Sequence, residues 1–75
     1  MFIEINGTNY NIYSIASFRK MQSLVDNGDN TQAVRFVIKY ALNNGVVLTE
    51  TFNDESECDE RYQTLVSAFA FNGGN

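Results

Sequence analysis

Asparagine precedes four of the five glycines of this chain, at Gly7, Gly28, Gly45 and Gly73. Both residue types tolerate a positive φ, so an Asn-Gly pair between apolar segments is a strong local signal for a hairpin turn. The first three pairs separate stretches in which apolar and polar residues alternate, as they do in half-buried strands. We therefore expect an antiparallel β-meander of about five strands over residues 2–53.

The first Asn-Gly pair predicts a two-residue turn that sets Ile3 opposite Tyr10. One face of this hairpin then holds the apolar side chains Ile3, Ile5, Tyr10 and Ile12. The alternation breaks at residues 13–15 and resumes at Phe18 and Met21. This change of phase predicts a bend or bulge that divides one long segment into two strands.

The third pair allows two registers for the hairpin around it. A three-residue loop with Gly45 in the left-handed region pairs Phe36 with Phe52 and unites the apolar residues, but it leaves Glu50 on that face. A two-residue loop instead sets Lys39 opposite Glu50. We favour the three-residue loop because it produces the more apolar face.

The last segment changes from the strand period to the helical one. Apolar residues recur with the spacing of an amphipathic helix at Cys58, Tyr62, Leu65, Val66 and Phe69. Either Asp54 with Glu57 or Ser56 with Asp59 can cap its start. We expect a helix over residues 56–71, ended by Asn72-Gly73, and a short polar tail over residues 72–75. The predicted fold is one α+β domain over residues 1–75, with the helix packed on one face of the sheet.

The amino-acid composition excludes several kinds of catalytic and metal-binding site. A chain of 75 residues with 44% hydrophobic residues folds as one small domain. It has no His and one Cys, which removes imidazole catalysis, conventional zinc sites and an internal disulfide. We therefore expect no enzyme activity, no cofactor and no metal. The sequence shows no export signal or membrane span, which predicts a cytoplasmic protein without membrane contact.

Acidic residues gather around the predicted start of the helix. Six of the nine acids lie within eleven residues, at Glu50, Asp54, Glu55, Glu57, Asp59 and Glu60. One interpretation is a solvated helix start, where negative charge complements the macrodipole. The other is an electronegative patch that binds the basic surface of a partner protein.

The face of the sheet that the helix leaves open is a second candidate site. We expect this exposed sheet face to hold aromatic, basic and apolar side chains, namely Phe2, Tyr13, Arg19, Lys20, Arg35, Val37 and Lys39. A mixed face of this kind on a small domain indicates a protein partner, and a second copy of the chain would enlarge the core. If a second copy binds this face, the protein is a homodimer or a higher homo-oligomer.

Two other kinds of ligand are alternatives for the same face. A small anion such as a nucleotide could be sequestered at an oligomer interface by the strand cations and tyrosines. Single-stranded nucleic acid has a weaker basis, because four strand cations in a chain of net charge −4 make a poor electrostatic footprint.

Asp26 and Asp29 suggest a calcium site and Cys58 suggests a nucleophile, but a structural role is favoured for all three residues. An EF-hand loop needs Gly at its sixth position and Glu at its twelfth, but counted from Asp26 these positions are Thr31 and Val37, which favours a polar hairpin loop. Cys58 lies on the apolar stripe of the helix, which favours a core residue over a nucleophile.

Three parts of the chain resemble short bacterial and phage-encoded proteins in which a β-meander ends in a helix that begins with acidic residues. They are residues 2–7, residues 12–15, and residues 52–62 together with Leu65. The resemblance implies a phage accessory protein, such as an inhibitor of a host defence system that acts in the host cytoplasm by binding a protein target. It transfers no catalytic residue.

Overall fold

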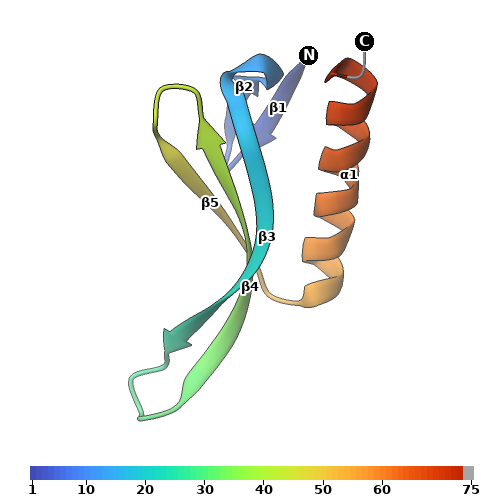
Figure 1. Cartoon of the computed structure of the whole chain (residues 1–75). Coiled ribbons are helices and arrows are strands. Elements are labelled where there is room, and N and C mark those ends of the chain that lie inside the picture. Colours follow the sequence, from blue (N-terminus) through green and yellow to red (C-terminus); the bar gives the residue numbers. More distant parts are fainter. Residues whose placement is uncertain (74–75) are drawn as a thin grey trace.

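The computed structural model describes residues 1–73, and side chains are described for residues 1–70. The elements are, in order, β1 (Phe2–Ile5), β2 (Thr8–Asn11), the 3-10 helix η1 (Ile12–Ser14), β3 (Ile15–Asp26), β4 (Gln32–Leu42), β5 (Val47–Phe52) and α1 (Glu55–Gly73). The predicted α+β class is confirmed, with five antiparallel strands and one helix against the sheet. The strands form two sheets, β1-β2 and β3-β4-β5, and not one continuous meander (Figure 1).

The first hairpin has the predicted register, with Ile3 opposite Tyr10 and Ile5 opposite Thr8. Its turn places Asn6 at φ 52° and Gly7 at φ 86°, the left-handed pair that an Asn-Gly turn favours. The predicted break after this hairpin is η1, and a register shift follows in β3 between Ile15 and Ser17. Because η1 turns the chain, β2 and β3 belong to different sheets.

The hairpin of β4 and β5 also has the register that the sequence analysis favours. Phe36 lies opposite Phe52, and Tyr40 lies opposite Leu48. Gly45, at φ 89°, donates from its backbone N–H to the carbonyl of Leu42 at 3.0 Å. The hairpin therefore closes through a three-residue loop that needs the left-handed conformation only glycine adopts at little cost.

The hairpin of β3 and β4 is longer than the rest of the sheet. β3 has 12 residues and β4 has 11, whereas β5 has 6 and pairs with β4 only from Phe36 to Ala41. The end of the hairpin, residues 23–35, is thus a two-stranded arm, and it extends past the start of α1 (Figure 1). At its tip Asp26 accepts from the N–H of Gly28 at 2.9 Å, and Asp29 accepts from the N–H of Thr31 at 3.1 Å. These carboxylates stabilise the loop.

The helix begins with the first of the two predicted caps. The Asp54 carboxylate accepts a hydrogen bond from the N–H of Glu57 at 2.8 Å. The helix spans Glu55–Gly73, so it begins one residue before the predicted start and ends two residues after the predicted end. The remainder of the expected tail, residues 74–75, lies outside the described residues. No helix in the described part of the chain is long and apolar enough to cross a membrane.

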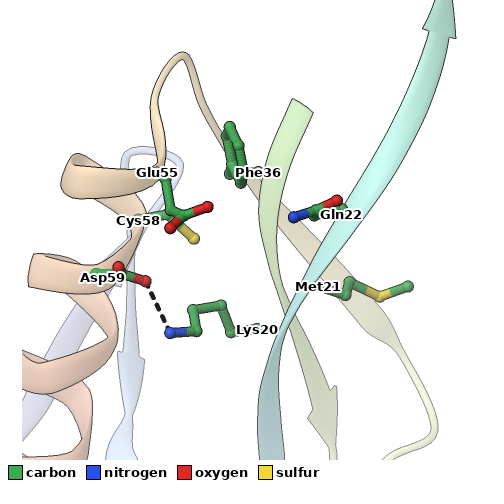
Figure 2. Close-up of a pocket in the computed structure, with 7 residues that line it drawn as sticks. All are labelled: Lys20, Met21, Gln22, Phe36, Glu55, Cys58 and Asp59. Carbon is green, nitrogen blue, oxygen red and sulfur yellow. Dashed lines mark hydrogen bonds and ion pairs between the residues drawn. The ribbon is translucent and has the colours of Figure 1, made fainter. Parts of the chain in front are cut away.

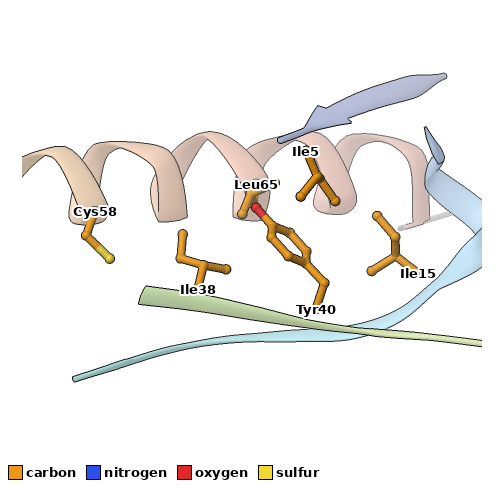
Figure 3. Close-up of a cluster of buried hydrophobic side chains, with 6 residues drawn as sticks. All are labelled: Ile5, Ile15, Ile38, Tyr40, Cys58 and Leu65. Carbon is orange, nitrogen blue, oxygen red and sulfur yellow. The ribbon is translucent and has the colours of Figure 1, made fainter. Parts of the chain in front are cut away.

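The core lies between α1 and one face of the three-stranded sheet, with the first hairpin closing one side. Its buried side chains come from three strands and the helix: Ile5, Ile15, Ile38, Tyr40, Cys58 and Leu65 (Figure 3). The ring of Phe18 extends this cluster, with its centroid 5.5 Å from that of Tyr62 and 4.9 Å from that of Phe69. Cys58 is therefore a core residue, as its place on the apolar stripe predicts.

Candidate functional site

The acidic residues are divided by the fold into two groups with different roles. Asp54 caps the helix, and Glu55, Glu57 and Glu60 are exposed on its first turns. Asp59 is also at the helix start, but its carboxylate accepts from the Lys20 ammonium at 2.7 Å. These positions match the interpretation of charge that complements the helix dipole.

Glu50 does not belong to this cluster. Its register position opposite Ile38 places its side chain between the sheet and the helix. One carboxylate oxygen accepts from the Tyr40 hydroxyl at 2.7 Å and from Nε of Arg61 at 3.0 Å. Arg61 also donates to the main-chain carbonyl of Glu4, so this network ties the helix to β4, β5 and β1. Burial raises the pKa of Tyr40, and the hydrogen bond with Glu50 raises it further.

Lys20 lies on the side of the sheet that faces the helix, which corrects its predicted place on the open face. It is opposite Ile38, and its Nζ lies 5.1 Å from the centre of the Tyr62 ring. The hydrogen bond with Asp59 raises the pKa of Lys20. Figure 2 shows Lys20 pointing toward α1 from β3, whereas the neighbouring Met21 points away.

A cavity of about 300 Å³ lies beside this ion pair, at the base of the arm. Its lining comes from β3, β4 and the helix start: Lys20, Met21, Gln22, Phe36, Glu55, Cys58 and Asp59 (Figure 2). Burial raises the pKa of the Cys58 thiol, and the nearby Asp59 carboxylate acts in the same direction. Both effects disfavour the thiolate that a cysteine nucleophile needs, so this cavity is a poor candidate for covalent chemistry.

The open face of the sheet, by contrast, collects three basic side chains. The residues of β3 and β4 that point away from the helix include Arg19, Arg35 and Lys39, and Arg19 lies directly opposite Lys39. The other two cations of the chain, Lys20 and Arg61, are the ones that form ion pairs. In the part of the chain that the structure describes, no ion pair neutralises the three on the open face.

No acidic residue occupies this open face. The nine acids lie on β1, at the tip of the arm, against the helix, or on the helix start, as the strand registers and the helix bounds place them. Like charges directly opposite each other on a sheet are unfavourable. The pairing of Arg19 with Lys39 is therefore a local cost that an anionic ligand would relieve.

A shallow depression of about 440 Å³ lies at this pair of cations. Its walls come from three strands, and its lining is Ser17, Phe18, Arg19, Lys39, Tyr40, Ala41 and Val47. It thus combines two positive charges, a hydroxyl group and apolar surface. This combination can hold a carboxylate or a phosphate together with an attached apolar group.

The other residues predicted for the open face are not all available there. Val37 lies on this face by its register with Met21 and Thr51, but it is only 3% exposed, so its prediction as an exposed contact residue is wrong. Phe2 and Tyr13 are exposed, as predicted, but they belong to β1 and η1 and not to the three-stranded sheet. The fold therefore places Arg19, Arg35 and Lys39 on one face of the sheet, with Arg19 directly opposite Lys39 and Arg35 four residues further along β4.

Sequence reasoning missed the partner of Glu50. A signal was present, because the favoured register placed a carboxylate on an apolar face, and such a group requires a hydrogen-bond donor when it is buried. Nothing in the local sequence indicated that Arg61 would supply that donor.

The chain matches no protein-family model, no curated protein and no solved structure.

Proposed function

We propose that this protein is a non-catalytic binding module, and that it binds an acidic surface of a partner protein through the open face of its sheet. The observation that supports this proposal most directly is a set of three basic side chains that have no ion-pair partner among the described residues and lie on a face without acidic residues: Arg19, Arg35 and Lys39. Complementary charge of this kind orients and accelerates association.

The open face suits a protein better than a nucleic acid. Proteins that bind single strands stack bases on aromatic side chains. The aromatic residues of β3, β4 and β5 are Phe18, Phe36, Tyr40 and Phe52, and their registers place them on the side of the helix. The open face offers arginine and methionine, which are enriched at protein interfaces.

The acidic helix start is the weaker of the two candidate surfaces. Asp54 is occupied as a cap and Asp59 in an ion pair, and Glu50 lies inside the domain. The more specific hypothesis, a phage-type inhibitor of a host defence protein, derives from the resemblance alone and would supply one identity for the partner.

The test is affinity capture from an extract of the source cells, with quantitative mass spectrometry of the captured proteins. The bait is compared with the double variant Arg19→Glu and Lys39→Glu, and with Lys20→Ala as a matched control on the opposite side of β3. We expect a specific partner of acidic surface, captured at least about tenfold less by the charge-reversal variant and unchanged by the control. Equal capture by all three proteins would refute the proposal.

A second measurement separates the partner classes. Backbone NMR titrations with an acidic peptide, a single-stranded oligonucleotide and a nucleotide report which ligand shifts the resonances around Arg19 and Lys39. We expect saturable shifts with the peptide. Saturation by the nucleotide alone would instead support the second candidate function, sequestration of a small anion in the 440 Å³ depression.

A further inference from the structure

The arm is the part of the β3-β4-β5 sheet that has only two strands. Residues 23–35 form two strands, and β5 ends its pairing at Phe36, before the arm begins. On the side of the helix, Leu24 lies opposite Val34, and these side chains are 66% and 43% exposed. An isolated two-stranded hairpin is marginally stable in water, and a third strand is the usual remedy.

The outer edge of β3 is open to such a strand. β3 is at the edge of its sheet, and no other strand of the described residues pairs with its second side. Edge strands are normally protected by charges, prolines or bulges. The stretch from Met21 to Val25 has none of these, and cations at Arg19 and Lys20 precede it while Asp26 follows it.

The charges at the two ends of this stretch make it complementary to itself. When two β3 edges pair antiparallel around a two-fold axis perpendicular to the sheet, opposite residues point to the same face, and the axis passes midway between the two copies of one residue. With the axis at Ser23, Lys20 of each copy lies opposite Asp26 of the other. With the axis at Gln22 or Leu24, Lys20 lies opposite Leu24 or Gly28 instead.

We propose that a second copy of this chain is the partner of the arm, and that the two β3 strands pair antiparallel about Ser23 to form one six-stranded sheet. The strand order is then β5-β4-β3 followed by β3-β4-β5 of the second copy. Each arm gains a third strand, and the uncharged edge is removed from water. The Lys20 ammonium has three N–H groups, so it can serve its own Asp59 and the Asp26 of the second copy.

This dimer uses the edge of the sheet and leaves the basic open face free. A two-fold axis perpendicular to the sheet puts both open faces on the same side, so the cations of the two copies form one extended surface. Direct stacking of two open faces is disfavoured, because it would bring Arg19 and Lys39 of one copy against those of another. The dimer can therefore be tested independently of the proposed protein partner.

Sedimentation equilibrium in the micromolar range provides the first test. We expect a mass of about 17 kDa, which is twice the chain mass of 8.5 kDa. Asp26→Lys sets two lysines opposite each other at both ends of the pairing, and we expect its dimer to dissociate at least about tenfold more readily. Adding Lys20→Asp together with Asp59→Lys exchanges the charges across the axis, keeps an ion pair between positions 20 and 59, and restores the dimer. A monomer at all concentrations, or open-ended aggregates, would overturn the proposal.

Cysteine cross-linking tests the register itself. Ser23→Cys places two thiols across the axis, within the Cα separation that a disulfide spans. Ser17→Cys is the matched control, because it lies on the same strand and the same face but opposite residue 29 of the second copy. Under mild oxidation we expect a covalent dimer from Ser23→Cys and none from Ser17→Cys, while the native Cys58 stays buried. Equal cross-linking of the two variants would refute this register.

Discussion

Arg61→Met removes the guanidinium group that holds Glu50 between the sheet and the helix. The variant retains the aliphatic length of the side chain, but it loses the 3.0 Å bond to Glu50 and the bond to the carbonyl of Glu4. The Glu50 carboxylate is then left with the Tyr40 hydroxyl as its described partner. We expect a loss of stability through an uncompensated, largely buried charge.

The exposure of the Arg61–Glu50 ion pair determines how much Arg61→Met lowers the free energy of unfolding. The side chains of Arg61 and Glu50 are 24% and 16% exposed. Breaking a fully buried pair costs about 3–5 kcal/mol, and an exposed pair contributes about 0–1 kcal/mol. An intermediate loss of about 2 kcal/mol follows, out of a total stability of roughly 7 kcal/mol at about 0.1 kcal/mol per residue. In a domain of this size it corresponds to a fall in Tm of about 8–16 °C.

Urea unfolding followed by circular dichroism, at one fixed chain concentration, measures the effect. Lys20→Met is the matched control, because it breaks an ion pair of similar length whose side chains are exposed; at a chain concentration that keeps both proteins monomeric, we expect it to cost much less stability than Arg61→Met. Combining Arg61→Met with Glu50→Gln should recover part of the loss, since the neutral amide tolerates burial better. If Arg61→Met costs no more than Lys20→Met, the reasoning about burial is wrong.

Two further variants probe the helix start and the core. Asp54→Ala removes the cap of α1 and should lower the free energy of unfolding by about 1 kcal/mol in the same urea assay, whereas Asp54→Asn should retain most of it. Burial raises the pKa of Cys58, so the unfolded thiol ionises at a lower pH than the folded one, and stability should fall as the pH rises above about 8.5. That decline should be shallower in Cys58→Ala, and an equal decline in both proteins would exclude the thiol as its source.

The turns, the registers and the helix start were predictable because each is determined over a few residues. The Asn6-Gly7 turn and the Gly45 loop follow from the cost of a positive φ, and once a turn is placed, the two-residue period of a strand decides which side chains share a face. The cap at Asp54 follows from unsatisfied N–H groups in the first turn of a helix. None of these features depends on distant parts of the chain.

The candidate site was predicted less completely. Arg19, Arg35 and Lys39 could be assigned to one face from the strand period, and in the structure all three lie on that face. Lys20 was assigned to the same face, although adjacent residues of a strand point to opposite sides, and it lies toward the helix. The burial of Val37 depends on the side chains that surround it in the folded protein. The two-residue period of a strand predicts which face a side chain lies on, but not how deeply it is buried.

The sequence by itself determined where the chain turns, which residues of each strand share a face, and where the helix begins. Only the tertiary structure decided that Arg61 neutralises Glu50, that the strands divide between two sheets, and that the arm extends beyond β5 and the start of α1. The physical reason is the range of the interactions. Local signals are dihedral preferences and periodicity, whereas the contacts of Arg61 with Glu50 and with Glu4 join residues that are 11 and 57 positions apart.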